Sequence, residues 1–283
     1  MTDYRLIALD VDGTILTPTG ELTPRMLAAA HEARSLGVTL ALATARRWTG
    51  AAPVARALDA ASALILYDGA LRRGFPSGTV EAVAPLTRDV AQVAARRIVE
   101  SGLRAVAQFS PASGERMVSS AEPPAGGWME PYLDNFAQQV RYKPVMSMLR
   151  GRAAPLRIVT FGPNTLLHAL AERMDDLTAE WQILPSGSYG QAELTVFAPG
   201  VSKGAALMEL AADRGVPIEE TMAIGDGVND ISMLRAAGLG VAMGHAALGV
   251  RAAADVITGS NDDDGAAQAI ERFVLGRRME EPA

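Results

Sequence analysis

Short apolar runs that end in acidic residues constrain the fold of this chain most. One run, in RLIALDVDGTIL, stops at Asp10 and Asp12, and another, in TMAIGDGVND, stops at Asp226. Apolar runs of this length are typical of strands buried on both faces, which occur mainly in parallel sheets covered by helices. In open sheets of this kind, ligands bind beyond the carboxyl ends of the strands. We therefore expect these acids at a ligand-binding edge.

Helical segments alternate with the apolar runs and define the domain organisation. Strand, helix, strand, helix, strand is the predicted order near the start, and the same rhythm resumes after Val201. Between these parts, a helix followed by two strands occurs twice, which indicates an antiparallel α+β unit. We predict an α/β protein with a parallel-sheet core over 1–82 and 192–283 and an inserted α+β domain over 83–191.

Composition excludes several classes of protein. The 283 residues carry a net charge of −6 and 49% hydrophobic residues, which fits a soluble globular protein and gives no electrostatic case for nucleic acid or an anionic membrane. Cysteine is absent, so thiolate metal sites and disulfides are excluded. No apolar stretch is long enough to span a membrane, and Asp3 and Arg5 interrupt any signal peptide. We expect a cytoplasmic monomer or small homo-oligomer.

Two acidic clusters are the leading candidates for a metal site. Residues two apart on a strand share a side, so Asp10 and Asp12 are expected to converge. Two adjacent carboxylates repel each other and need a cation, a shared proton or different local environments. Asp226 ends a second strand, and Asp230 opens the following helix. Oxygen ligands of this type suit Mg²⁺. Taken singly, Asp12 with Gly13 is also common turn chemistry, and Asp230 also suits a helix N-terminus.

Two further residues point to an anion site. Thr44 follows the second predicted strand, where its hydroxyl and the free N–H groups of the next turn can bind an anion. Lys203 begins a helix behind the N-cap candidate Ser202, a position that is unfavourable for a cation unless an anionic group compensates. Alternatively, Thr44 merely ends a strand and Lys203 is a solvated surface residue.

The order of these motifs resembles the haloacid dehalogenase superfamily. DVDGT, Thr44, Lys203 and GDGVND match its four motifs, and the long insertion between Thr44 and Lys203 matches the α/β cap of its Cof-type (type IIB) phosphatases. LTVFAPGVSKGAAL and GVAMGHAALGVRAAADVIT are also similar to that subfamily. The resemblance implies a Rossmann-like core and a cap that selects the substrate.

The resemblance also implies catalytic roles. Asp10 would be the nucleophile that forms an aspartyl-phosphate, and Asp12 would be the general acid and base. Mg²⁺ would be held by the Asp10 carboxylate, the Asp12 main-chain carbonyl and Asp226. Asp230 would orient metal-bound waters or Lys203.

A second group of residues would bind the phosphoryl oxygens. By resemblance these are Thr44, Lys203, Asn229 and backbone N–H groups of the turn that contains Ala45. Arg46 and Arg47 follow Thr44, and either can reach a substrate or lie on the surface.

Three positions depart from the subfamily pattern. Ala45 replaces a usual glycine, Asp68 replaces a common asparagine, and His245 replaces a frequent asparagine. A negative charge at Asp68 would disfavour strongly acidic leaving groups, unless Asp68 only turns the chain with Gly69.

The expected activity is Mg²⁺-dependent hydrolysis of a small soluble phosphomonoester, such as a sugar phosphate or a phosphorylated cofactor. A hexose phosphomutase similar to phosphomannomutases, and a phosphatase specific for glycosyl phosphates, are alternatives within the same chemistry. A module that only binds phosphorylated ligands is the alternative outside it.

Overall fold

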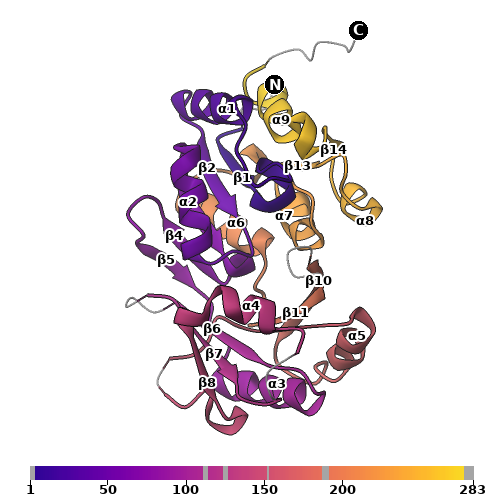
Figure 1. Cartoon of the computed structure of the whole chain (residues 1–283). Helices are drawn as coiled ribbons and strands as arrows, with labels where there is room; N and C mark the ends of the chain where they lie inside the picture. The colour runs from indigo at the N-terminus through magenta and orange to yellow at the C-terminus, as the bar shows by residue number, and fades with distance from the viewer. Residues whose placement is uncertain (1–3, 111–113, 124–126, 152, 187–190, 277–283) are drawn as a thin grey trace. The chain divides into compact units, whose positions relative to one another are not determined.

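Two compact units make up the chain. The computed structural model describes residues 4–110, 114–123, 127–151, 153–186 and 191–276 (Figure 1). One unit combines Met1–Ala82 with Ser202–Ala283, and the other is Val83–Val201. The second boundary predicted from the sequence, at residue 192, is therefore too early. It falls inside the strand β11 (Gln191–Phe197), which pairs with β9 (Arg157–Gly162) of the second unit.

The first unit is built on an eight-stranded sheet in the order β14-β13-β12-β1-β2-β3-β4-β5. The pairs from β14 through β3 are parallel, and β4 runs antiparallel to β3. The predicted parallel sheet is thereby confirmed. The strands are β1 (Leu6–Leu9), β2 (Thr39–Ala43), β3 (Ala61–Leu66), β4 (Leu71–Gly74), β5 (Val80–Val83), β12 (Thr221–Gly225), β13 (Leu239–Ala242) and β14 (Val256–Ile257).

Side-chain size differs between the two faces of this sheet. One face is rich in alanine, including Ala8, Ala41 and Ala223, and packs against the apolar side of α6 and α7. Small side chains let these helices approach the strands closely. The opposite face carries larger residues such as Leu9 and Leu42, which are also fully buried. Both faces are thus removed from water, as the unbroken apolar runs predict.

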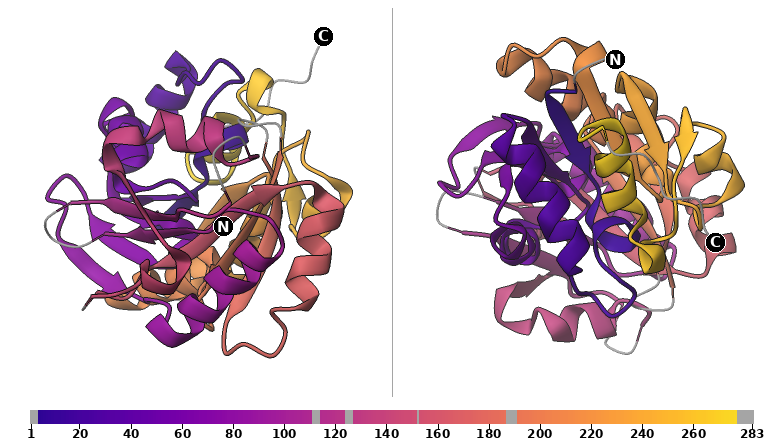
Figure 2. Two further views of the ribbon diagram at one scale, coloured as in Figure 1. Left: turned by 60° about the horizontal axis from the view of Figure 1, so that its bottom comes forward. Right: turned by 90° about the horizontal axis from the view of Figure 1, so that it is seen from above.

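The first helix of this unit, α1, begins where local chemistry predicts. Thr23 caps α1 by accepting a hydrogen bond from the Met26 N–H, and Pro24 takes the first helical position. Figure 2 shows α1 and α2 on one side of the sheet and α6 on the other. The helices are α1 (Pro24–Ser35), α2 (Trp48–Leu58), α6 (Lys203–Asp213), α7 (Ile231–Ala236), α8 (Leu248–Arg251) and α9 (Gly265–Phe273).

Strand order places a switch point beside β1. The chain leaves β1 toward β2 on one side and returns much later to β12 on the other. Leu9 is in register with Leu42 of β2 and with Ile224 of β12, so the three strands end at one level. A crevice at such a point, beyond the carboxyl ends, is where open α/β sheets bind ligands.

The second unit is an α+β domain, as predicted. Its sheet has the order β10-β11-β9-β6-β7-β8 and is antiparallel except for the pair β7 and β8. Helices α3 and α5 cover one face, and α4 packs on the other. The remaining elements are β6 (Val106–Phe109), β7 (Arg116–Ser120), β8 (Val140–Lys143), β10 (Glu180–Ser186), α3 (Arg88–Glu100), α4 (Glu130–Asn135) and α5 (Asn164–Glu172).

Strand β4 of the first unit is absent from the sequence prediction because charged residues conceal it. Its segment LRRG contains Arg72, whose side chain is buried and forms ion pairs with Glu81 and Asp213. These partners compensate a buried charge, which local hydropathy does not reveal. Within the described ranges, no helix is long and apolar enough to cross a membrane.

The packing of α6 yields a stability prediction. Leu207 is fully buried between α6 and the sheet, whereas Leu248 on α8 is 76% exposed. Leu207→Ala is expected to lower the free energy of unfolding by about 2–5 kcal/mol, because it removes buried surface and leaves a cavity. Leu248→Ala, the matched control, should change it by less than about 0.5 kcal/mol. Urea denaturation measures both, and equal effects would contradict the packing described.

Candidate active site

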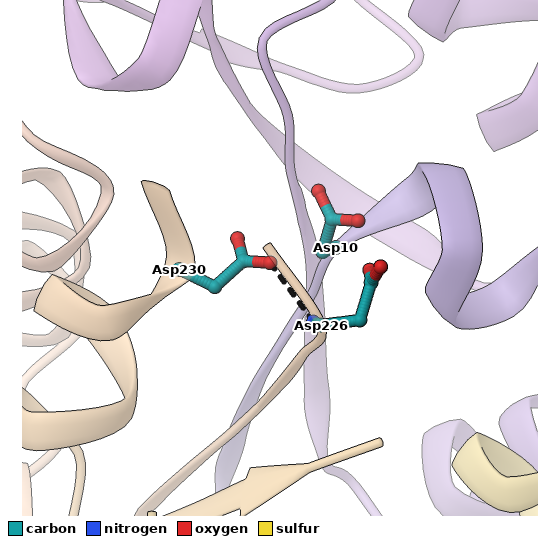
Figure 3. Close-up of side chains that lie close together, drawn as sticks. All are labelled: Asp10, Asp226 and Asp230. Atoms are coloured by element: carbon teal, nitrogen blue, oxygen red, sulfur yellow. Dashed lines mark hydrogen bonds between the residues drawn. The ribbon is translucent and has the colours of Figure 1, made fainter. Parts of the chain in front are cut away.

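Functional side chains gather at the ends of three adjacent strands. Asp10 directly follows β1, Thr44 follows β2 and Asp226 follows β12. These strands are neighbours in the sheet and end at one level. Figure 3 shows that Asp10, Asp226 and Asp230 lie close together at this edge.

A buried lysine links two of these acids. The Lys203 Nζ donates hydrogen bonds to Asp10 Oδ1 and to Asp230 Oδ1, each at 2.6 Å. Lys203 is the first residue of α6, and Ser202 caps that helix by accepting from the Ala205 N–H. A cation at a helix N-terminus is unfavourable, so the two carboxylates supply the predicted anionic compensation. The alternative of a solvated surface lysine is wrong.

Both carboxylate oxygens of Asp230 accept hydrogen bonds. While Oδ1 accepts from Lys203, Oδ2 accepts from the backbone N–H groups of Asp226 and Gly227, at 3.0 and 2.8 Å (Figure 3). These bonds fold the turn that carries Asp226. Asp230 is therefore suited to orient Lys203 and Asp226 rather than to bind a ligand directly.

Asp226 is held by the turn that follows β1. Its Oδ1 accepts from Thr14 Oγ1 at 2.9 Å, and its Oδ2 lies 3.5 Å from His245 Nε2. Gly13 makes this approach possible. Its φ is +81°, and a Cβ there would lie 2.5 Å from Asp226 Oδ2. Thr14 belongs to the DVDGT motif, but motif matching alone does not assign it to Asp226.

Electrostatics of the cluster favour an added cation. Burial, reinforced by the charge of Asp230, raises the pKa of Asp10 well above its usual range. The same two causes raise the pKa of Asp226. Burial by itself lowers the pKa of Lys203, but Asp10 and Asp230 more than offset this and raise it, so the lysine stays charged. Three carboxylates thus share one ammonium group.

The donor set fits a hard divalent cation. Asp10, Asp226 and Asp230 each offer a carboxylate oxygen, and these atoms lie within 4.8 Å of one another. Because Asp230 is committed to Lys203 and two N–H groups, Asp10 and Asp226 are the carboxylates best placed to bind directly. One or two carboxylates with several waters is the usual protein environment of Mg²⁺.

Asp12 is not part of the carboxylate cluster that Asp10 forms with Asp226 and Asp230, so the argument from strand alternation does not describe this site. Strand β1 ends at Leu9, so both acids lie beyond it, and the two-residue period no longer applies. The Asp12 side chain is 61% exposed and pairs with Arg46, which donates from Nε and Nη2 at 2.8 and 2.6 Å. A guanidinium only donates hydrogen bonds, so both Asp12 oxygens act as acceptors.

The loop after β2 carries the other predicted phosphate-binding residues. Thr44 is buried, and its Oγ1 accepts from the Arg46 N–H at 3.1 Å, which tightens the turn and leaves the hydroxyl proton available. Ala45 is partly exposed in this turn. Arg46 also donates to the Gly50 carbonyl, so its side chain is fixed toward Asp12.

Asn229 has a partner that sequence spacing does not predict. Its Nδ2 donates to Asp68 Oδ1 at 2.8 Å, and Asp68 is buried. The two residues lie 161 positions apart. Asp68 departs from the subfamily pattern, and that departure is the signal that could direct attention to it.

Comparisons with known proteins agree with this geometry. A profile of the haloacid dehalogenase-like hydrolase family matches residues 7–270. The chain is 30% identical to pyridoxal phosphate phosphatase YbhA of Escherichia coli (strain K12), over 96% of this chain and 99% of that protein.

Solved structures show the same fold over nearly the whole length. A haloacid dehalogenase-like hydrolase from Bacteroides thetaiotaomicron superimposes with a TM-score of 0.77 at 27% identity, over 96% of this chain and 100% of that one. The subclass IIB sugar phosphatase BT4131 gives a TM-score of 0.79 at 22% identity, over 95% and 98%.

The raised pKa values of Asp10 and Asp226 predict pH-dependent metal binding. The folded protein without metal holds protons at these groups more tightly than the unfolded chain, so it loses stability as the pH rises through their titration. Mg²⁺ competes with those protons. The rise in melting temperature on adding MgCl₂ should therefore be larger at about pH 7.5 than at about pH 5.5.

Variants identify the groups responsible. Asp226→Asn should abolish most of the Mg²⁺-induced shift at both pH values, while the exposed Asp262→Asn should leave it unchanged. A shift that is equal at both pH values, or that survives Asp226→Asn, would contradict the metal assignment.

Proposed function

Because the chain belongs to the haloacid dehalogenase-like hydrolases and is a phosphatase of their Cof type, we propose that it hydrolyses small phosphomonoesters with Mg²⁺ through an aspartyl-phosphate at Asp10. The arrangement of Asp10 carries this proposal. Its Oδ1 is held by Lys203, and its Oδ2 accepts no hydrogen bond from any described residue. One oxygen is thus anchored, and the other is left for attack on phosphorus.

The first step transfers the phosphoryl group to the enzyme. An Asp10 carboxylate oxygen attacks phosphorus, the bond from phosphorus to the leaving oxygen breaks, and Asp12 gives that oxygen a proton. Lys203, at 2.6 Å from Asp10, keeps the attacking carboxylate oriented. Bound Mg²⁺ would supply charge neutralisation for Asp10, Asp226 and the phosphoryl oxygens.

The second step releases phosphate. Asp12 takes a proton from water, the water oxygen attacks phosphorus, and the carboxylate of Asp10 leaves. The pairing of Asp12 with Arg46 suits this step, because both Asp12 oxygens are acceptors there. For the first step, one of these two bonds has to open so that Asp12 can carry the proton.

Phosphoryl oxygens would be bound by Thr44, Lys203 and Asn229, with Ala45 contributing its backbone. Thr44 follows β2, Lys203 begins α6, and Asn229 lies in the turn before α7. Donors fixed by separate rigid elements can be arranged before the substrate arrives, which is how enzymes stabilise charge that develops during phosphoryl transfer.

The second unit, inserted between Thr44 and Lys203, would select the substrate. YbhA is named a pyridoxal phosphate phosphatase, and BT4131 a sugar phosphatase. We therefore place phosphorylated cofactors such as pyridoxal phosphate, together with sugar phosphates, first among the candidates.

A substrate panel tests the proposed function. Pyridoxal 5′-phosphate, hexose 6-phosphates and hexose 1-phosphates should be assayed for Mg²⁺-dependent release of inorganic phosphate. Release from at least one of them is expected. Interconversion of hexose 1- and 6-phosphates without phosphate release would instead establish a mutase, and binding without turnover of any of them would establish a binding module.

Substitutions of Asp10 and of Asp12 separate the roles of these two acids. Asp10→Asn should lower kcat by more than about 1000-fold with every substrate, because the nucleophile is lost. Asp12→Asn should lower kcat/KM, which reports the first step, by about 100-fold with alkyl phosphates and by less with p-nitrophenyl phosphate, whose leaving group needs no proton.

Asp262→Asn serves as the control for both and should remain within about twofold of wild type. Phosphate release that survives Asp10→Asn would overturn the nucleophile assignment. An effect of Asp12→Asn on kcat/KM that does not depend on the leaving group would overturn the acid assignment.

A further inference from the structure

The turn Tyr67–Gly69 after β3 has an unusual backbone. Tyr67 and Asp68 both have positive φ, +51° and +55°. Residues other than glycine are disfavoured in this region and persist only where the surrounding structure holds them. Here the Tyr67 N–H donates to the Arg46 carbonyl and the Asp68 N–H to the Thr44 carbonyl, both at 3.2 Å. The loop that carries Thr44 thus holds the turn.

The same turn contacts the start of α6. Gly69 has a φ of +108°, and a Cβ on it would lie 2.3 Å from the Ser202 carbonyl oxygen and 3.3 Å from the Lys203 nitrogen. Only glycine allows so close an approach. The turn therefore packs against two elements assigned to phosphoryl binding, the Thr44 loop and the N-terminus of α6.

Asp68 connects this turn to the third such element. Its buried Oδ1 accepts from Asn229 Nδ2 at 2.8 Å. An ionised carboxylate can only accept, so the amide nitrogen of Asn229 has to face Asp68. The amide oxygen lies over Gly227, where a Cβ would be 2.4 Å from it. These contacts distinguish the amide nitrogen of Asn229 from its amide oxygen.

We propose that Asp68 is a positioning residue for Asn229: its carboxylate fixes the amide so that the second Nδ2 hydrogen is directed to the phosphoryl group. This inference rests on the proposed phosphatase function. An asparagine at this position, as the subfamily pattern has it, can either donate or accept. It would therefore permit both orientations of the Asn229 amide, whereas aspartate permits one.

The test compares Asp68→Asn, Asn229→Ala and the double variant with wild type. Asparagine tolerates the left-handed backbone as aspartate does, so Asp68→Asn should fold. Asp59→Asn is the matched control, because Asp59 also has positive φ, +48°, and is exposed at the end of α2. Thermal unfolding of each variant verifies folding.

Two measurements follow. In side-chain amide NMR, the Asn229 resonance, identified by its loss in Asn229→Ala, should move upfield in Asp68→Asn, because a charge-assisted bond becomes a neutral one. With p-nitrophenyl phosphate and Mg²⁺, Asp68→Asn should lower kcat/KM about fivefold when Asn229 is present and less than about twofold when it is replaced. Asp59→Asn should change neither quantity.

Either of two results overturns the inference: an Asn229 resonance that Asp68→Asn leaves unmoved, or an equal loss of kcat/KM with and without Asn229. Failure of the wild-type protein to release phosphate contradicts the proposed function instead. The NMR comparison separates that case, because it requires no turnover.

Discussion

The ammonium group of Lys203 lies between the carboxylates of Asp10 and Asp230, 2.6 Å from each, and is shielded from solvent. Removing one partner of such a buried pair typically costs about 3–5 kcal/mol, because the remaining charge is left uncompensated. The first residue of α6 is therefore tied both to the end of β1 and to the turn before α7. This link joins segments of the chain that lie almost 200 residues apart, and the rest of the site is arranged around it.

The three acids have different roles because both carboxylate oxygens of Asp230 already accept hydrogen bonds. Asp230 uses both oxygens to hold Lys203 and the turn that carries Asp226, whereas Asp10 keeps an oxygen without a hydrogen bond from the described residues. The raised pKa values of Asp10 and Asp226, caused by burial and by Asp230, indicate that the site is short of positive charge. We therefore propose that Mg²⁺ offsets the carboxylate charges in the enzyme without substrate as well as during phosphoryl transfer.

Sequence reasoning succeeded where a local rule governs the structure. Unbroken apolar runs predicted buried parallel strands, and the position of Lys203 behind Ser202 predicted an anionic partner. Sequence reasoning was wrong where a local rule no longer applied, and it missed contacts between residues that lie far apart in the sequence. Alternation ends with β1 at Leu9, and Asp12 pairs with Arg46 outside the cluster of Asp10, Asp226 and Asp230. The contact of Asp68 with Asn229 spans 161 positions and leaves no spacing to detect.

The central claim is that Asp10 itself receives the phosphoryl group. Wild-type enzyme can be acid-quenched during turnover of p-nitrophenyl phosphate with Mg²⁺ and treated with borohydride, which reduces an aspartyl-phosphate to homoserine. Mass spectrometry of the peptide containing residues 6–25 should then show homoserine at position 10, and no such product in a sample quenched without substrate. Reduction at another acidic residue, or an unmodified peptide during steady turnover, would contradict the account.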